Sequence, residues 1–342
     1  MAQPFDPDRL ETKGEAVRLA EGVPTYVQPS RGASFTVSAN GLLAYQSEDS
    51  ATGSRLAWKD RQGKVLGNLD ETGDEMFEMA LSPDGKRLAA LAGSSEDIWI
   101  YDTARGIRTR FTFNPGIDLS PVWSPDGATI YYSSGLNLFR KVSDGASSEE
   151  LLMSDPAEAS LFPTSFSPDG KALLHVKRGE ATNDNLWVLP VAPAHPGGKP
   201  EPRVFLQTQF NELGGQFSPD GNWVAYFSDE SGVFEVYAAP YPGPGGKRQI
   251  SSGGGKYPRW RRDGKELFYV TPTGDLMAAE VASRNGTLEI GRVQKLFEGI
   301  IQSEGTYAVS ADGQKFMVVE NSGARSSHPW MLIENWPGTL RK

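Results

Sequence analysis

The chain has 342 residues, of which 38% are hydrophobic and 10% aromatic, with 38 Gly and 24 Pro. The Gly and Pro share of about 18% is below the roughly 25–30% typical of low-complexity disorder, and the apolar content suffices for a large core, so we expect a stable globule. The absence of Cys excludes disulfide scaffolds, thiolate metal sites and cysteine nucleophiles. The net charge of −9 argues against nucleic acid as a partner, because a binder of polyanions needs a basic stripe to displace counterions.

Membrane-spanning and secretory segments are not recognisable in the sequence. No segment approaches the ~18 uninterrupted apolar residues of a membrane helix. Residues 1–7 also lack the basic and apolar regions of a secretory signal. We therefore expect no membrane insertion by this segment, and we expect a monomer.

A four-residue motif recurs along the chain. It reads Ser-Pro-Asp-Gly in four copies and is a variant of this in three. The copies lie at residues 38–41, 82–85, 124–127, 167–170, 218–221, 261–264 and 310–313. Proline presets φ, aspartate bonds nearby backbone and glycine accepts a positive φ, so each copy predicts a tight turn between two strands. The steps between the glycines are 44, 42, 43, 51, 43 and 49 residues, which indicates one structural unit per turn.

Apolar segments rich in β-branched and aromatic residues follow the turns, as expected of buried strands. In chain order these second strands are 87–91, 129–132, 223–227, 266–270 and 315–319. Third strands are predicted at 97–101, 185–189 and 234–237, and fourth strands in segments such as 108–113. Four strands in about 43 residues are typical of a propeller blade.

Helices are expected to be few and short, because no 11-residue window has a convincing apolar period of 3.6 residues. The predicted class is therefore all-β, as a single β-propeller domain of four-stranded antiparallel blades over residues 1–342. A pair of β-sandwiches is the alternative, although sandwiches rarely repeat one turn at nearly constant spacing.

The two ends of the chain are predicted to complete one blade together. The last unit has three predicted strands at 306–309, 315–319 and 329–334 and lacks an outer strand. Residues 10–22 resemble residues 288–299, the outer strand expected in the sixth unit. We therefore predict that residues 1–23 complete the last blade of a seven-bladed ring, which removes the free sheet edges. Six or eight blades remain as alternatives.

The motif resembles the repeat of TolB-like, WD-repeat-like bacterial propellers, because it follows Trp123, Phe166 or Phe217 and precedes a short apolar strand. This resemblance covers nearly the whole chain. Residues 58–64, 217–226 and 241–247 further resemble the C-terminal propeller of bacterial transmembrane serine/threonine kinases. In those kinases the propeller is the sensing or protein-binding end, so the resemblance implies a sensor role and an extracytoplasmic, periplasmic location. No His-Arg-Asp loop, Asp-Phe-Gly motif or glycine-rich phosphate loop of a kinase is present in this sequence.

The usual catalytic signatures are also missing. The sequence has no Gly-x-Ser-x-Gly and no His-Glu-x-x-His, and its three histidines, His175, His195 and His328, lack metal-ligand spacing. Each turn aspartate lies in a different predicted blade, too far from the others to share an ion, so we expect these residues to stabilise their turns. They are Asp84, Asp126, Asp169, Asp220, Asp263 and Asp312. We predict no catalytic residue, no metal site and no cofactor.

Charge divides the two faces of the predicted ring. Loops between strands 2 and 3 and between blades share one face and are rich in acids, whereas the repeated turns lie on the other, more basic face. We predict that the acidic face, with aromatic side chains near the channel, receives a protein or peptide partner, a basic one being favoured by the field. The candidate binding residues are Asp74, Glu75, Phe77, Asp118, Phe162, Phe210, Glu212, Tyr257 and Arg259. Solvated loop charges without a binding role are the alternative.

The sequence thus predicts a non-catalytic propeller that binds or senses a protein or ligand, as the sensor part of a membrane kinase in the favoured interpretation. A TolB-like periplasmic adaptor is one alternative. The other is a propeller enzyme, or a gating domain, with a metal in its central channel, since an acidic mouth suits a divalent cation.

Overall fold

The computed structural model describes residues 2–3, 5–17, 19, 35–38, 42–46, 54–70, 76–92, 96–114, 116–155, 157, 159–179, 183–192, 200–243, 245–284, 286–300, 307–321, 330–334 and 336–339. The chain divides into two compact units. One unit is Ser54–Glu320, and the other combines Met1–Gly53 with Asn321–Lys342. This division differs from the single domain over residues 1–342 that the sequence predicted.

The larger unit contains six four-stranded antiparallel sheets among its described residues. The first is β7 (Met76–Leu81), β8 (Arg87–Ala92), β9 (Asp97–Asp102) and β10 (Arg108–Arg110), and the second is β11 (Asp118–Trp123), β12 (Thr129–Ser134), β13 (Asn137–Val142) and β14 (Glu150–Met153). The third is β15 (Ser160–Phe166), β16 (Ala172–Arg178), β17 (Asn185–Pro190) and β18 (Arg203–Leu206), and the fourth is β19 (Glu212–Phe217), β20 (Trp223–Ser228), β21 (Glu235–Pro240) and β22 (Arg248–Gln249). The fifth is β23 (Lys256–Trp260), β24 (Glu266–Val270), β25 (Leu276–Arg284) and β26 (Thr287–Phe297), and the sixth is β27 (Tyr307–Val309), β28 (Lys315–Asn321), β5 (Ser54–Asp60) and β6 (Val65–Asp70).

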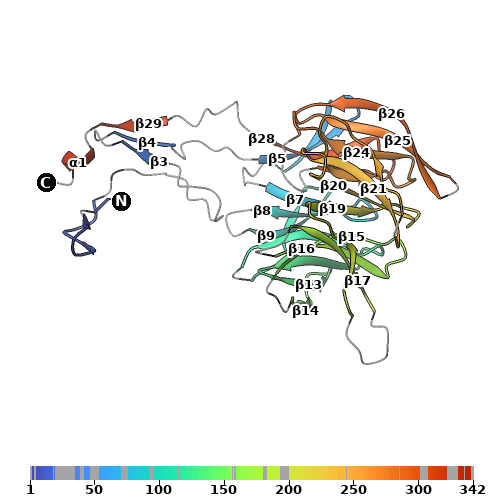
Figure 1. Cartoon of the computed structure of the whole chain (residues 1–342), viewed down its shortest axis with the longest axis horizontal. Helices are drawn as coiled ribbons and strands as arrows, with labels where there is room; N and C mark the ends of the chain where they lie inside the picture. The colour runs from blue at the N-terminus through green and yellow to red at the C-terminus, as the bar shows by residue number, and fades with distance from the viewer. Residues whose placement is uncertain are drawn as a thin grey trace. The chain divides into compact units, whose positions relative to one another are not determined.

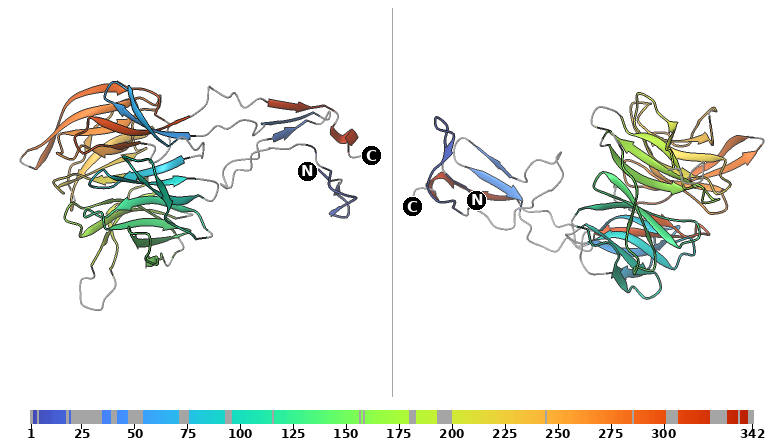
Figure 2. Two further views of the ribbon diagram at one scale, coloured as in Figure 1. Left: turned by 180° about the vertical axis from the view of Figure 1, so that it is seen from behind. Right: turned by 90° about the horizontal axis from the view of Figure 1, so that it is seen from below.

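The six sheets follow one another around a closed ring. The inner strand of each sheet contacts the inner strand of the next, and β27 of the sixth sheet contacts β7 of the first. Figure 1 shows this succession in the colour order of the chain, and Figure 2 shows it from behind and from below. In the described part of the unit, six buried apolar clusters each combine residues from two neighbouring sheets, so every junction of the ring has its own core. The predicted all-β propeller of four-stranded antiparallel blades is confirmed.

The alternation of side chains along β20 explains how one strand contributes to two cores. Trp223, Ala225 and Phe227 pack against the fifth sheet, whereas Val224 and Tyr226 pack against the third. Successive side chains of a strand point to opposite faces, and both faces of this sheet are covered. A continuous apolar segment is therefore what a central blade strand requires.

The sixth sheet closes the ring with two strands from the start of the larger unit. β5 pairs beside β28 and β6 is the outer strand, so the strands of lowest and highest number in the ring lie side by side (Figure 1). Leu56 and Ala57 of β5 are fully buried, and Leu56 packs in one cluster with Met317 of β28. The apolar residues of β5 gain burial that the predicted N-terminal strand does not show, since Leu10 is 78% exposed and β2 (Glu11–Thr12) pairs with β1 (Phe5–Asp6).

The expected closure by residues 1–23 is therefore replaced by β5 and β6 in the described structure. The count of seven blades is not confirmed, because the described ring has six sheets, one of the alternatives that the sequence left open.

The smaller unit holds a three-stranded sheet in the order β29 (Trp330–Ile333), β4 (Leu43–Gln46), β3 (Phe35–Val37). It also contains the β1–β2 pair and the short helix α1 (Trp336–Thr339). Among the described residues, no helix has the length and apolar character needed to cross a membrane.

The repeated turns have the predicted chemistry. In the first turn of the ring, Ser82 Oγ donates to Asp84 Oδ1 at 2.7 Å and accepts from the backbone N–H of Arg87 at 2.9 Å. The same carboxylate oxygen accepts from the N–H of Lys86 at 3.1 Å, and Gly85 has a φ of 72°. The serine and aspartate thus hold the backbone of a turn whose last position suits glycine. The predicted role of the turn aspartates is confirmed.

Candidate binding site at the turn end of the channel

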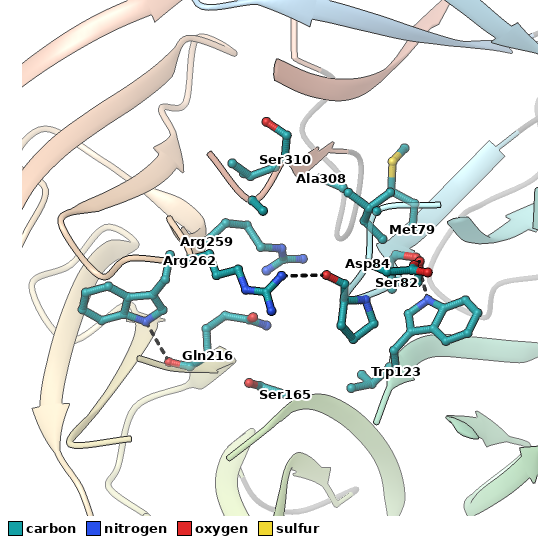
Figure 3. Close-up of a pocket in the computed structure, with 18 of the residues that line it drawn as sticks. Met79, Ser82, Asp84, Trp123, Ser165, Gln216, Arg259, Arg262, Ala308 and Ser310 are labelled. Atoms are coloured by element: carbon teal, nitrogen blue, oxygen red, sulfur yellow. Dashed lines mark hydrogen bonds between the residues drawn. The ribbon is translucent and has the colours of Figure 1, made fainter. Parts of the chain in front are cut away.

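A cavity of about 1110 Å³ lies in the larger unit where the inner strands end and the repeated turns begin. Figure 3 shows residues from several sheets around this hollow. Residues from all six sheets line its wall. They are residues 58 and 66–67 and residues within the ranges 79–85, 121–125, 164–168, 216–219, 259–262 and 308–315. The cavity therefore occupies the end of the channel that carries the repeated turns, which is the end opposite to the predicted acidic face.

Prolines of the turns make the rim of this cavity regular over four junctions. In each case the proline ring packs against the glycine of the following turn, where a Cβ would lie within 4 Å of the ring. The pairs are Pro83 with Gly127, Pro125 with Gly170, Pro168 with Gly221 and Pro219 with Gly264. These are ordinary van der Waals contacts that pack neighbouring turns against each other, and it is the φ of 70–72° at these four positions that favours glycine.

The rim changes character at the fifth and sixth turns. Arg262 takes the place of the proline in the fifth turn and Ala311 in the sixth, and nothing lies within 4 Å of the Cβ position of Gly85. Arg262 is exposed, and its Nη1 donates to the backbone carbonyl of Pro83 at 3.0 Å. One arginine thus spans the part of the rim where the proline series is interrupted (Figure 3).

Hydrogen bonds between sheets hold the walls below the rim. The indole N–H of Trp123 donates to the carbonyl of Ala80 at 2.9 Å, and that of Trp260 donates to the carbonyl of Gln216 at 3.1 Å. The side chain of Gln216 in turn donates to the carbonyl of Thr164 at 2.7 Å. Each bond joins inner strands of two different sheets, so the cavity is preformed by the backbone of the ring.

Deeper in the channel, inner strands bulge at equivalent positions. Ser120, Gly214 and Tyr257 have φ values of 55°, 59° and 57°, and the strand register shifts at each of them. Glu78 accepts a hydrogen bond from the backbone N–H of Ser120 in this region. Bulges of this kind re-aim side chains and occur often beside functional sites.

The seven predicted binding residues that the structure describes are not brought together at the cavity. Asp74 and Glu75 lie outside the described residues, and Phe77 belongs to β7. Phe162 lies in β15 with the guanidinium of Arg178 5.0 Å from its ring, and Phe210 is half-buried just before β19. Tyr257 and Arg259 lie in β23, and of the seven predicted residues that the structure describes, Arg259 alone lines the cavity.

Two of the predicted carboxylates are buried rather than presented to a partner. Asp118 begins β11 and Glu212 begins β19, with exposures of 0% and 1%. Burial raises the pKa of both side chains above their ordinary values. Both carboxylates therefore belong to the interior of the strand starts, and the binding role of the acidic face stays a prediction.

The sequence contained a signal for the cavity that the charge comparison of the two faces missed. Residues 261–264 read Arg-Arg-Asp-Gly where four other turns read Ser-Pro-Asp-Gly. This departure removes the proline that packs on the next glycine and places a cation at the rim. Within the described ranges, no group of three or more His, Cys, Asp or Glu residues is arranged to hold a metal ion.

No family model matches the chain. The chain is 32% identical over 161 residues to an uncharacterized protein of Agrobacterium fabrum. The alignment covers 42% of this chain and 52% of that relative, so the chain spans about half the length of the curated relative it matches.

Solved structures share the fold at low identity. A protein of Agrobacterium tumefaciens assigned as a TolB has a TM-score of 0.61 at 17% identity, over 80% of this chain and 99% of that one. Hydrazine synthase of Kuenenia stuttgartiensis has a TM-score of 0.54 at 16% identity, over 91% and 99% of the two chains. An oligogalacturonate lyase in complex with manganese has a TM-score of 0.51 at 16% identity, over 89% and 81%. The chain therefore has a β-propeller fold similar to that of the TolB protein.

Proposed function

We propose that the chain is a non-catalytic binding propeller that takes a segment of a partner protein into the turn end of its channel. The observation that carries this proposal is the cavity of about 1110 Å³ lined by residues of the six sheets. Its volume lies at the upper end of the range of about 300–1,000 Å³ for small-molecule sites. A hollow of this size with a rim of turns has room for a short stretch of polypeptide.

The rigidity of the walls supports the same function. Indole and amide groups of Trp123, Trp260 and Gln216 tie neighbouring inner strands together, and the turn prolines pack on the glycines that follow. A preformed site binds without ordering its own loops, which lowers the entropic cost of association. The fold itself hosts binding and catalysis alike, so the argument depends on the cavity rather than on the likeness to TolB.

Two more specific roles would make the chain part of a larger assembly. The resemblance in sequence favours the sensor end of a membrane kinase, and a TolB-like adaptor is the second possibility; an extracytoplasmic, periplasmic location accompanies either role. A basic partner at the acidic face is a separate proposal. It depends on exposed acids of that face, because Asp118 and Glu212 are buried.

A library of displayed octapeptides tests the binding function without a known partner. Wild-type protein is expected to enrich related peptides, and a bulky side chain at the rim, Ala311→Trp, is expected to abolish their binding. Ala104→Trp is the matched control, because Ala104 is also exposed, in a turn after β9, but does not line the cavity. Failure to enrich any family of peptides, or equal binding to Ala311→Trp, would contradict the proposal.

A further inference from the structure

We propose that Arg259, Arg262 and Lys315 form a carboxylate-binding corner of the cavity, which selects an acidic segment of the partner. This inference depends on the proposed function and names the chemistry of its ligand. All three cations line the cavity, and they belong to the fifth and sixth sheets and their turns. They gather where the proline rim is interrupted. In Figure 3 the side chains of Arg259 and Arg262 both extend into the hollow.

Three neighbouring cations, Lys59, Arg61 and Arg261, are already neutralised by carboxylates. Glu266 accepts hydrogen bonds from both Arg61 and Arg261, and Asp263 also pairs with Arg261. Lys59 pairs with Glu320 at 2.7 Å. In contrast, no ion pair links Arg259, Arg262 or Lys315 to any carboxylate of the described residues. Within the described residues, the three cations of the corner therefore keep their positive charge.

The two acids of the cavity wall are occupied within their own turns. Asp84 Oδ1 accepts from Ser82 Oγ and from the N–H of Lys86, and Asp312 Oδ1 accepts from Ser310 Oγ at 2.6 Å. These bonds lower the pKa of both carboxyls and hold them in the turn backbone. Neither acid forms an ion pair with the corner cations, although the charge of Lys315 contributes to the lowered pKa of Asp312.

The contact between Arg262 and Pro83 can be exchanged for a stronger one. The guanidinium donates from Nη1 to a neutral carbonyl at 3.0 Å. A carboxylate accepts charge-assisted hydrogen bonds from a guanidinium, often two in parallel, and these are roughly twice as strong as neutral ones. The turn holds the start of the side chain in place, since the N–H of Gly264 donates to the carbonyl of Arg261 at 2.9 Å. A ligand carboxylate therefore meets an exposed arginine whose backbone is held by the turn.

The proposed ligand is an acidic peptide rather than an acidic sugar. The aromatic side chains of the wall do not decide between the two, because Trp123 is 6% exposed whereas Trp58, Phe166 and Trp260 are half-buried. The prolines of the rim offer apolar surface to side chains of a peptide.

Fluorescence anisotropy with labelled octaglutamate tests the inference on the full chain. Octaglutamate is expected to bind wild-type protein more weakly as salt rises, because the contact is electrostatic. Arg262→Gln is expected to weaken binding about 10-fold or more, as the loss of a hydrogen bond to a charged group does. Arg292→Gln is the matched control with the same change of charge, since Arg292 is exposed on β26 and does not line the cavity.

The outcomes separate this inference from the proposed function. It is overturned if octaglutamate does not bind, if Arg262→Gln and Arg292→Gln weaken binding equally, or if trigalacturonate binds more tightly than octaglutamate. Enrichment of neutral octapeptides that Ala311→Trp abolishes would leave the proposed function standing and remove the acidic selectivity. Unchanged thermal unfolding of Arg262→Gln shows that its loss of binding is local.

Discussion

Arg61 and Glu266, 205 residues apart in the chain, are joined by two hydrogen bonds, from Nη1 at 3.0 Å and from Nη2 at 2.8 Å. Arg61 follows β5 in the sixth sheet and Glu266 begins β24 in the fifth, so this pair fastens the closing sheet to its neighbour. Glu266 is 7% exposed and also accepts from Arg261 at 2.6 Å. Two guanidinium groups thus depend on one buried carboxylate.

Removing that carboxylate is expected to destabilise the ring. Glu266→Ala leaves Arg61 and Arg261 without their common partner, and breaking a buried pair costs about 3–5 kcal/mol of unfolding free energy. Urea denaturation measures the change. Glu289→Ala is the control, because Glu289 is 55% exposed and 3.8 Å from Arg284, and such surface pairs contribute about 0–1 kcal/mol. Equal effects of the two substitutions would contradict the role of Glu266 in closure.

The burial of β5, the strand that closes the ring, leads to a second prediction about stability. Leu56→Ala in β5 removes a fully buried side chain from the cluster that joins the sixth and first sheets. A loss of about 2–5 kcal/mol is expected, since the truncation leaves a cavity. Leu10→Ala removes the same atoms from a side chain that is 78% exposed and is expected to change the melting temperature little. The reverse order of the two effects would favour closure by the N-terminal residues.

The hydrogen bonds of the turn serines lead to a third prediction. Ser218→Ala removes the acceptor of the backbone N–H of Trp223, at 2.9 Å, and the donor to Asp220. Because Trp223 is 3% exposed, its N–H would lose its partner away from water, at a cost of about 1–3 kcal/mol. Ser218→Thr keeps the hydroxyl and is expected to recover most of the stability in thermal unfolding. No loss in Ser218→Ala would show that the turn does not depend on this hydroxyl.

A fourth prediction concerns acid stability. His175 in β16 is fully buried, and burial lowers its pKa from 6.5 to about 4. Above pH 6.5 the side chain is neutral in both states, whereas between pH 6.5 and about 4 the unfolded chain binds the proton first. The stability is therefore present above pH 6.5 and is lost as pH falls towards 4, by about 3 kcal/mol for this group.

The variant His175→Leu isolates this contribution. Carboxylates that titrate in the same pH range contribute equally to the unfolding free energies of wild type and variant, so their contributions cancel in the difference. That difference is expected to move in favour of the variant as pH falls from 6.5 to 4, measured by urea denaturation at fixed salt. A difference independent of pH would show that His175 titrates normally.

The sequence by itself determined the sheets. Ser-Pro-Asp-Gly turns carry their own hydrogen bonds, such as Ser82 to Asp84, so local residues suffice to predict the reversal and the strands that flank it. Near-constant spacing of the turns then predicted four-stranded units and the propeller class. The aspartates of the turns were correctly assigned to structure for the same local reason.

Only the tertiary structure decided how the ring closes and where its cavity lies. The pairing of β5 with β28 joins the first and last strands, in sequence, of the propeller unit. β5 is buried there by distant residues such as Met317, which cannot be identified from the sequence around β5. Burial of Asp118 and Glu212 likewise depends on neighbouring loops, so counting acids on a face could not separate exposed from interior carboxylates. The hydrogen bond from Arg262 to Pro83 spans 179 residues, and contacts of that range exist only once the sheets have assembled.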